Sequence, residues 1–586
     1  MLITQAQRFL TTPITGKNRP SSKFSLVFWY SLSLVFAVGY ISLGLREAFS
    51  GEYVVGDNAR EYVSWMYRYF NPELFPHDLI ADYFQSVTPI GYGAFYQLMA
   101  HLGIDPVLLG KLLPMAVTLC TTSYGFAVCM QLLPVPLAGF LTTVLLNQSI
   151  CLHDDLFSAC PRDFIYPLFL IFLYYLLRGS LFGVLVAIAL QSLFYPLIAF
   201  IDCGILLFRL CLWKNQQFRL SQDRKDYLFF ATSVCVALVT IIPYAIQSSK
   251  FGPTITAAVA RTIPEYLSGG RVSYFNLNPV SFWLDGRDSG LFALISPPQL
   301  FIGLFLPIIL LYQSRFPLTK QLTNKLNIIP RIVLASTCMF FIAHAVAFRL
   351  HWPSRYTHHT FKMVFALAAG ITLTLILDAA FHWSEQLITK PRRTRRQFFT
   401  LGVTAIVGAF LLLYPSFLKV FPKTPYVAGA TPALYKFLQQ QPQDSLVASL
   451  AGEANNIPVF AQRSILVGSE YALPFHTKYY ARFRQRVIDL INAQYSEDIN
   501  QAINFISKYD VKFWLLERSA FKHEYIADNK WIQQYQPAAD QAKSMLEKGS
   551  TPALSKLMQS CSVFETDSLA VLEARCIKTM KESKEN

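Results

Sequence analysis

The sequence predicts a polytopic α-helical membrane protein with about 11 transmembrane helices and a C-terminal extracytoplasmic α/β domain. Three observations support this fold class. Of the 586 residues, 53% are hydrophobic and 15% are charged, whereas soluble proteins average about 25% charged residues. Long apolar runs recur along residues 24–421. Residues 422–586 lack such runs and read as a soluble segment.

The first membrane span is predicted at residues 24–45. This run contains no charged residue, and Arg8 and Lys23 precede it. Because basic residues concentrate on the cytoplasmic side, we expect residues 1–23 in the cytoplasm. The run is too long and too far from the start of the sequence for a cleaved signal peptide.

The remaining spans follow from further apolar runs. These runs cover residues 112–133, 137–152, 164–177, 181–212, 227–245, 291–312, 332–348, 363–381 and 398–418. The 181–212 run is interrupted at Pro196, and basic residues lie at both of its ends, at Arg178 and Arg209. Two short spans are therefore predicted there, which makes the number of spans odd.

An odd number of spans predicts that the C-terminal domain lies outside the cytoplasm, with the protein in the plasma (inner) membrane. On the same side we place the outer loops 46–111, 153–163, 247–290 and 349–362. Within residues 422–586, the segments DSLVASL (444–450) and VKFWLLE (511–517) predict buried strands. Residues 431–441 and 496–508 have helical periodicity, which together with these strands predicts an α/β module.

Several functional classes are not supported by the sequence. No P-loop, GxGxxG after a strand, HExxH or GxSxG motif is present. The net charge of +15 is accounted for by basic residues at predicted cytoplasmic ends, so nucleic acid is not expected as a partner. Two cysteine pairs, Cys151 with Cys160 and Cys561 with Cys576, could form disulfides in an oxidising compartment; reduced thiols are an equal alternative.

The first outer loop contains Asp57, directly after the first span and before a predicted amphipathic helix. One interpretation is a helix N-cap, since an aspartate accepts hydrogen bonds from the free amides of the next turn. The functional interpretation is a carboxylate held at the membrane surface as a general base or metal ligand. The two interpretations are compatible.

The second outer loop brings acidic and basic residues together. Asp154 and Asp155 could hold a divalent cation, Mg²⁺ or Mn²⁺, between themselves and phosphate oxygens. Arg162 would add a cation for a phosphate. The alternative is a solvated loop in which Arg162 pairs with Asp163.

The third and fourth outer loops supply further candidates. Glu265 and Arg271 flank a glycine pair that would let the third loop bend over a ligand. The fourth loop carries a basic cluster that predicts a phosphate site, because arginine gives bidentate contacts and lysine a point charge. Its members are Arg355, His358, His359 and Lys362. The alternative is that these side chains extend toward lipid headgroups; a zinc site at the histidine pair is not expected.

This arrangement resembles the GT-C superfamily of glycosyltransferases that use polyprenyl-phosphate-linked sugars. The likeness rests on Asp57 in VVGDNAREY after the first span, the acidic second loop HDD (153–155), the number of spans and the C-terminal domain. The run from Asp57 to Phe84 is also similar to that of multi-span proteins common in cyanobacteria. The stretch TIPE (262–265) is similar to the TIxE stretch of oligosaccharyltransferases, whereas a WWDYG-type motif is absent from residues 422–586.

The resemblance implies an inverting transfer of a sugar to an extracytoplasmic glycan, lipid or protein. In this scheme Asp57 would deprotonate the acceptor hydroxyl, while Arg162, Arg355 and Lys362 would stabilise the leaving polyprenyl phosphate. Asp154 or Asp155 would bind a metal or orient the acceptor. The competing hypothesis is a transporter, flippase or assembly scaffold for lipid-linked glycans, without catalysis.

Overall fold

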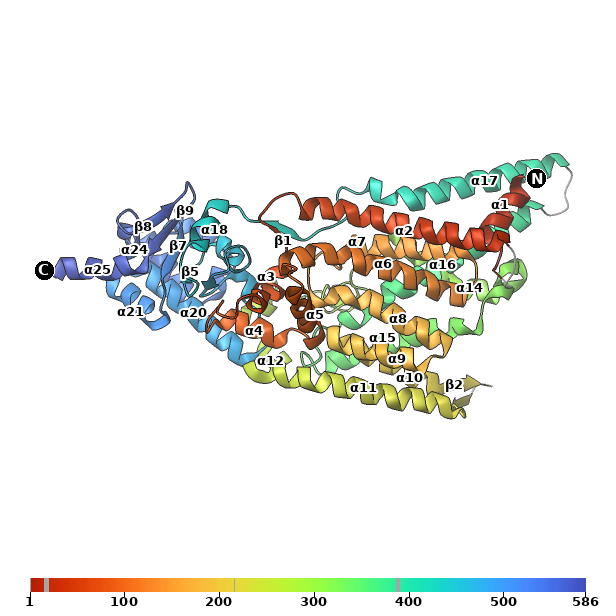
Figure 1. The fold of residues 1–586 in the computed structure, drawn as a ribbon, viewed down its shortest axis with the longest axis horizontal. Helices are drawn as coiled ribbons and strands as arrows, with labels where there is room; N and C mark the ends of the chain where they lie inside the picture. The colour runs from red at the N-terminus through yellow and green to blue at the C-terminus, as the bar shows by residue number, and fades with distance from the viewer. Residues whose placement is uncertain (1, 15–19, 215–216, 386–389, 586) are drawn as a thin grey trace.

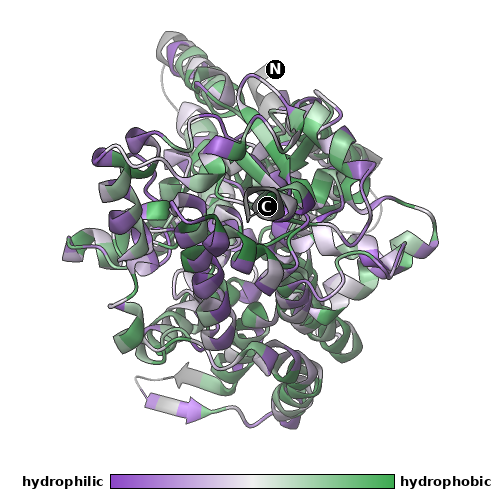
Figure 2. Cartoon of the chain, turned by 90° about the vertical axis from the view of Figure 1, so that its left-hand side faces the viewer, coloured by the Kyte–Doolittle hydropathy of each residue, from purple (hydrophilic) through white to green (hydrophobic). Residues whose placement is uncertain are grey.

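The computed structural model describes residues 2–14, 20–214, 217–385 and 390–585. Figure 1 shows two parts along the long axis: a bundle of long, roughly parallel helices, and an α/β module at one end that carries the C-terminus. Short elements of the first outer loop lie between them, around α3, α4 and α5. Figure 2 looks at the module from its end, where hydrophilic segments are prominent around the C-terminus.

The bundle contains a helix at every predicted span. Its long elements are α2 (Pro20–Ala48), α6 (Pro106–Leu132), α7 (Pro136–Cys151), α8 (Ile165–Arg178), α9 (Leu181–Phe194), α10 (Pro196–Leu210), α11 (Arg224–Ser248), η5 with α14 (Pro298–Phe305 and Leu306–Leu311), α15 (Ile328–Ala345), α16 (Arg355–Glu385) and α17 (Lys390–Leu413). Within the described ranges, six helical segments are long and apolar enough to cross a membrane, those at 23–48, 106–132, 224–251, 324–345, 355–385 and 394–417. The protein is therefore a multi-span membrane protein, while the total number of spans stays a prediction.

The predicted break in the 181–212 run is confirmed. Helix α9 ends at Phe194, and α10 begins at Pro196, where a proline is tolerated because the first helical turn has no internal acceptor for its amide. Tyr195 between them has a non-helical backbone, with φ −149° and ψ 84°. Two structures near the other end of the bundle were not predicted: a short helix α1 (Leu2–Thr11) and a hairpin of β2 (Cys211–Lys214) and β3 (Gln217–Leu220).

Helix α16 is the central helix of the bundle. It packs against α7, α15 and η5, and its residues from Tyr356 to Ile371 are buried. Small side chains allow the close approach: a Cβ atom on Gly370 would collide with Thr142 of α7. The chemistry-bearing residues at the start of α16 are therefore held on a rigid element.

The first outer loop joins the bundle to the C-terminal module. It consists of β1 (Val54–Gly56), α3 (Ala59–Tyr62), η1 (Ser64–Tyr69), α4 (Leu79–Val87) and α5 (Ile90–His101). Strand β1 pairs antiparallel with β4 (Tyr426–Ala428), with Val55 opposite Val427. Asp78 caps α4 by accepting from the amides of Ile80 and Ala81 at 2.8 and 3.1 Å.

The fourth outer loop is shorter than predicted, because residues 355–362 form the first turns of α16. Among the described residues, the third outer loop contains the end of α11 and four short elements. These are η3 (Ser249–Phe251), α12 (Ala257–Ala260), η4 (Pro264–Tyr266) and α13 (Pro279–Leu284). Three further turns follow α14 at the other end of the bundle: η6 (Gln313–Arg315), η7 (Pro317–Gln321) and η8 (Asn324–Asn327). Tyr266 and Trp352 of these outer loops contact each other in an aromatic cluster that also includes Phe475 of the module.

The C-terminal module contains a five-stranded sheet in the order β6-β5-β7-β9-β8. The strands are β5 (Leu446–Ser449), β6 (Ser464–Ile465), β7 (Phe513–Glu517), β8 (Ser562–Glu565) and β9 (Leu569–Glu573). Strands β6, β5 and β7 run parallel, and β9 and β8 add an antiparallel edge. Both predicted strands are confirmed, as β5 and β7.

The helices of the module cover this sheet and continue to the end of the chain. They are α18 (Pro432–Gln439), α19 (Ile457–Phe460), α20 (Thr477–Tyr495), α21 (Ile499–Tyr509), α22 (His523–Ala527), α23 (Ala538–Glu547), α24 (Ala553–Leu557) and α25 (Ala574–Glu585). The two predicted helices correspond to α18 and α21. Cys561 and Cys576 form a disulfide, whereas Cys151 and Cys160 are free thiols.

Candidate active site at the junction of bundle and module

A cavity of about 350 Å³ lies where the outer loops meet the C-terminal module. We call it the junction cavity. The bundle side contributes Arg162, Tyr195 and Arg355, the first outer loop contributes Asn58, Glu61 and Tyr83, and the module contributes Leu473, Phe475 and His476. Arg271 and Arg349 also line it. The cavity thus combines several guanidinium groups, one carboxyl group and many aromatic rings.

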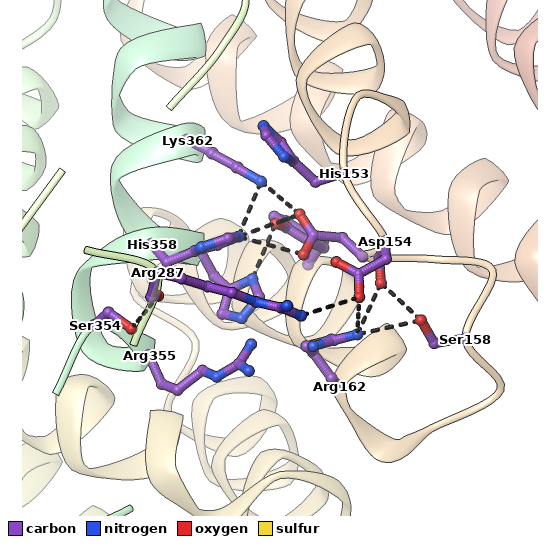
Figure 3. Close-up of polar contacts among 12 residues, drawn as sticks. His153, Asp154, Ser158, Arg162, Arg287, Ser354, Arg355, His358 and Lys362 are labelled. Atoms are coloured by element: carbon purple, nitrogen blue, oxygen red, sulfur yellow. Dashed lines mark hydrogen bonds and ion pairs between the residues drawn. The ribbon is translucent and has the colours of Figure 1, made fainter. Parts of the chain in front are cut away.

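Arg162 and Arg355, which both line this cavity, each have an unpaired donor. Nη2 of Arg162 donates to the backbone oxygen of Asp154 at 2.8 Å and to Ser158 Oγ at 3.2 Å. Nη2 of Arg355 lies 3.7 Å from Asp288 Oδ1. The Nε atoms of both arginines are buried and have no hydrogen-bond partner among the described residues. Figure 3 shows the two side chains close to each other at the start of α16 and the end of the second outer loop.

A buried charge cluster lies behind Arg355 on the same helix. Arg355, His358, His359 and Lys362 recur at helical spacing and so share one face of α16. Lys362 Nζ donates to Asp155 Oδ2 at 2.6 Å, and the Tyr166 hydroxyl donates to the same oxygen at 2.8 Å. His358 Nε2 lies 3.3 Å from Asp155 Oδ1, and His359 Nδ1 lies 2.9 Å from the Tyr166 hydroxyl.

The cations around Asp155 keep it ionised despite its burial. Desolvation raises the pKa of Asp155, but Lys362 and His358 more than offset that effect and hold the pKa well below its ordinary value. Asp154 likewise has its pKa lowered, because Arg162, Arg287 and Arg355 outweigh its desolvation. The residues predicted as one phosphate site are therefore divided: Arg162 and Arg355 line the cavity, whereas His358, His359 and Lys362 contact Asp155 or its partner Tyr166.

Asp155, His358 and His359 place three potential metal ligands within 4.8 Å of one another. The structure thus groups Asp155 with two histidines, whereas Asp154 lies beside Arg162 and Arg287, at 3.5 and 3.7 Å. A divalent cation on Asp155 would lie close to the Lys362 ammonium group, which already occupies Oδ2. In this arrangement Asp154 and Asp155 already have cationic partners. A divalent cation between the two carboxylates does not fit, because those partners would repel it.

Asp57 forms an ion pair with Arg60 and is partly exposed, with 37% of its side-chain surface accessible. It does not cap the following helix: the N-cap position of α3 is Asn58, and no side chain caps it. Its backbone amide donates to Pro425 O at 2.8 Å, which fixes the loop next to β4. Asp57 is not among the residues that line the junction cavity, although its neighbour Asn58 is.

Glu61 is the carboxyl group that does line the cavity, and sequence analysis did not single it out. It is 5% exposed, and Arg271 Nη2 lies 3.3 Å from its Oε1. Desolvation, followed by the charge of Glu470, raises the pKa of Glu61 well above its ordinary value, in spite of Arg271. Glu61 lies four residues after Asp57, a spacing that would place both carboxyl groups on one face of the predicted amphipathic helix, and this was a signal available in the sequence. In the structure only Glu61 lies in α3.

The C-terminal module completes this side of the site through Glu470. Its carboxylate accepts from Arg60 at 2.8 Å and forms an ion pair with Arg271. Arg60 thereby bridges Asp57 to Glu470, and Arg271 bridges Glu61 to Glu470. Glu265, the other candidate of the third loop, instead accepts from the Tyr480 hydroxyl of α20 at 2.8 Å. No local sequence signal links residue 470 to the first outer loop.

Two histidines at the cavity remain neutral. Burial and the neighbouring Arg355 lower the pKa of His351 to about 3. Burial lowers the pKa of His476 to about 4, and its Nδ1 lies 3.1 Å from the Tyr83 hydroxyl. Neutral imidazoles can accept or donate a hydrogen bond to a bound sugar without adding charge.

Comparisons with known proteins were made at the level of sequence and of structure. No protein-family model matches the sequence, and no curated protein matches it. The apo crystal structure of the Archaeoglobus fulgidus oligosaccharyltransferase matches with a TM-score of 0.52 and 11% identity, over 88% of this chain and 72% of that chain. AglB from the same organism, in complex with an inhibitory peptide and a dolichol-phosphate, matches with a TM-score of 0.52 and 10% identity, over 89% and 72%.

A third solved structure, the same oligosaccharyltransferase tethered to an acceptor peptide, gives a TM-score of 0.50 at 13% identity, over 88% of this chain and 72% of that chain. At these identities the likeness concerns the fold. It extends over both the helical bundle and the C-terminal module, since it covers most of the chain. The chain therefore has the fold of this archaeal oligosaccharyltransferase.

Proposed function

We propose that the protein is a membrane-bound glycosyltransferase that moves a sugar from a polyprenyl-phosphate donor to an extracytoplasmic glycan, lipid or protein. One observation supports this proposal: Arg162 and Arg355, each with a buried Nε that has no hydrogen-bond partner among the described residues, line the same cavity as the carboxyl group of Glu61. Guanidinium groups bind phosphate oxygens through paired hydrogen bonds. A carboxyl group in the same cavity can accept the proton of an attacking hydroxyl.

The chemistry is a displacement at the anomeric carbon of the donor sugar. The acceptor hydroxyl loses its proton to a carboxylate as its oxygen bonds to this carbon, and the bond to the phosphate oxygen breaks. The electron pair of that bond stays on the phosphate, where Arg162 and Arg355 stabilise the added charge. Attack from the face opposite the phosphate inverts the configuration of the sugar.

Two carboxyl groups compete for the role of base. Asp57 is the base that the sequence predicts, and it would act after its ion pair with Arg60 opens. Glu61 already lines the cavity, and its raised pKa brings it closer to the proton affinity that general-base catalysis favours. Glu470 holds both partner arginines, Arg60 and Arg271, and so orients either carboxylate.

The predicted cation, Mg²⁺ or Mn²⁺ at Asp154 and Asp155, is not used in this mechanism. The ammonium group of Lys362 neutralises Asp155, His358 contacts the same carboxylate, and Arg162 and Arg287 lie beside Asp154. In this proposal these fixed cations keep the second outer loop in place and position Arg162. The negative charge of the phosphate is matched by arginine.

The partners in this proposal are a polyprenyl-phosphate-linked sugar, an extracytoplasmic acceptor and membrane lipids. The solved complex of AglB with a dolichol-phosphate supports this class of donor for the fold. We further propose that the cavity and the C-terminal module face away from the cytoplasm. The Cys561–Cys576 disulfide supports this orientation, because disulfides persist in oxidising compartments.

The test is transfer by the purified protein in nanodiscs, with polyprenyl-phosphate sugars that carry a radiolabel. We expect labelled product with wild type and none with a variant that combines Asp57→Asn and Glu61→Gln, at unchanged thermal stability. Unimpaired transfer by this variant would refute the carboxylate mechanism. Transbilayer movement of the lipid-linked sugar without transfer would instead identify a flippase. Profiling of accumulated lipid-linked glycans in a deletion strain would name the sugar.

A further inference from the structure

A second, larger hollow lies on the outside of the molecule, next to the junction cavity. It has a volume of about 890 Å³ and lies between α4, the end of α11 with the adjoining η3, and the first turns of α20. Its wall includes Gln85, Gln247, Lys250, Lys478 and Arg482. We call it the α20 groove. It shares no lining residue with the junction cavity.

The α20 groove carries an excess of positive charge. Lys250, Lys478 and Arg482 are exposed, and none of them has a carboxylate within 4.0 Å among the described residues. The acidic side chain in the groove, Asp82, is already paired with Arg68 at 2.8 Å. Three cations therefore face the groove without a counter-charge, which favours an anionic ligand.

The groove opens onto an apolar surface of α11. Ile242 and Ile246 of α11 are 53% and 66% exposed and, four residues apart, share one face of the helix. Lys250 follows Ile246 by four residues, in the adjoining η3. In a membrane-spanning helix such exposed isoleucines contact lipid tails. The lipid-contacting surface of α11 therefore lies within about two helical turns of the cations. A lipid has the matching arrangement, with an apolar tail below a phosphate group.

Helices α4 and α11 separate the groove from the junction cavity. Tyr244 and Ser248 of α11 line the cavity, whereas Gln247 of α11 and Lys250 of η3 line the groove. The two helices are fixed to each other by a hydrogen bond of 2.9 Å from Gln247 Nε2 to the backbone oxygen of Gln85. A ligand in the groove would lie one helix away from the proposed site of sugar transfer.

We propose that the α20 groove binds the phosphate of a membrane lipid between Lys250, Lys478 and Arg482, with the lipid tail along Ile242 and Ile246. The lipid is either an anionic phospholipid of the bilayer or a polyprenyl phosphate, which present the same chemistry to the groove. The site is separate from the transfer reaction, and its occupancy is measured without any turnover.

The experiment measures lipid binding to the full-length protein in detergent by native mass spectrometry. The probes are phosphatidylglycerol, decaprenyl phosphate and inorganic phosphate. The test variant combines Lys250→Gln, Lys478→Gln and Arg482→Gln. The control variant combines three exposed lysines of the module that lack ion pairs among the described residues, Lys522→Gln, Lys530→Gln and Lys556→Gln.

We expect at least one of the two lipids to bind wild type and the control variant equally, and the test variant more than tenfold more weakly, since a cation near a lipid phosphate contributes about a factor of five. Equal binding of both lipids would assign the groove to bilayer phospholipid, and preference for decaprenyl phosphate would assign it to the carrier lipid. Unchanged binding by the test variant would overturn the proposal, as would inorganic phosphate binding as tightly as the lipids. If the triple variant does not purify as a single species, Lys250→Gln alone is used with the same criteria.

Discussion

The ammonium group of Lys362 lies 2.6 Å from Oδ2 of Asp155, and both side chains are fully buried. This ion pair connects the rigid first turns of α16 to the second outer loop. Tyr166 and His358 supply further contacts to the same carboxylate, so its lone pairs are largely used. Because Arg162 and Arg355 extend from these two segments, the pair sets the spacing of the cations that face the junction cavity.

Loss of one partner of this pair should destabilise the protein strongly. Lys362→Met leaves Asp155 buried without its main counter-charge, for which we expect a loss of about 3–5 kcal/mol in the free energy of unfolding. Lys508→Met removes a pair between Lys508, which is half-exposed, and Asp489, and should cost about 1 kcal/mol or less. Thermal or denaturant unfolding in detergent compares the two variants. A double variant, Asp155→Asn with Lys362→Met, should recover part of the loss; no recovery would mean that the ion pair is not the cause.

If Arg355 holds the donor phosphate, its replacement by lysine should lower kcat/KM for the donor. Arg355→Lys keeps the charge but removes the planar pair of donors, including the buried Nε–H. A hydrogen bond to a charged group contributes about 1.5–3 kcal/mol, so kcat/KM for the donor should fall by about 10- to 100-fold. Arg287→Lys is the matched control, because Arg287 is 67% exposed and does not line the cavity. Equal losses in both variants would argue against phosphate binding by Arg355.

The burial of Glu61 predicts a characteristic pH dependence. Its pKa in the folded protein is raised above 4.5, so the folded state binds a proton that the unfolded state has already lost. The stabilising contribution is therefore complete below the unfolded pKa and is lost as the pH rises through the folded pKa. If Glu61 is the base, transfer rises over the same window as the carboxylate forms.

The measurement is the pH profile of kcat/KM for wild type, Glu61→Gln and Asp57→Asn. We expect the acidic limb to persist in Asp57→Asn and transfer to be lost in Glu61→Gln, at thermal stability close to that of wild type. The reverse pattern, with transfer lost only in Asp57→Asn, would assign the base to Asp57 as the sequence predicts.

Much of the fold was accessible from the sequence because hydropathy follows from local composition. The apolar runs marked each bundle helix, and Pro196 marked the break between α9 and α10. The strands β6, β8 and β9 were not predicted: β6 has two residues, and the other two pair only with strands distant in sequence or with each other. Short strands carry too little periodicity to be identified on their own.

The site was predicted less completely, because its assembly depends on tertiary contacts. Helical spacing could place Arg355, His358, His359 and Lys362 on one face, but it could not show that Asp155 engages Lys362 and His358 and leaves Arg355 at the cavity. Glu470 reaches Arg60 across 410 residues of sequence. Glu61 was overlooked in favour of Asp57, although burial, which local sequence does not reveal, distinguishes the two carboxyl groups.

The proposed orientation predicts which face of the membrane labels a cysteine in the module. Ser544→Cys in α23 should react with a membrane-impermeant maleimide in intact cells, and Asn324→Cys, at the opposite end of the bundle, should react only after the cells are opened. Wild type provides the background from its eight free cysteines. In the same samples, a thiol count before and after reduction should reveal the Cys561–Cys576 disulfide. If intact cells label Asn324→Cys and not Ser544→Cys, the orientation is the reverse of the one proposed.

Chelation distinguishes the proposed mechanism from one that depends on a metal. The donor atoms of Asp155, His358 and His359 lie close enough to hold one ion, but Lys362 and Tyr166 already donate to the carboxylate. A divalent cation would have to displace the ammonium group and face its charge at short range in a buried site, which is unfavourable. We therefore expect transfer by the purified protein to continue in EDTA, and addition of Mg²⁺ or Mn²⁺ to change the rate less than twofold. Activity that is lost in EDTA, restored by Mn²⁺ and absent in His359→Ala would show that the cluster is a metal centre and that Lys362 moves away from Asp155 when the ion binds.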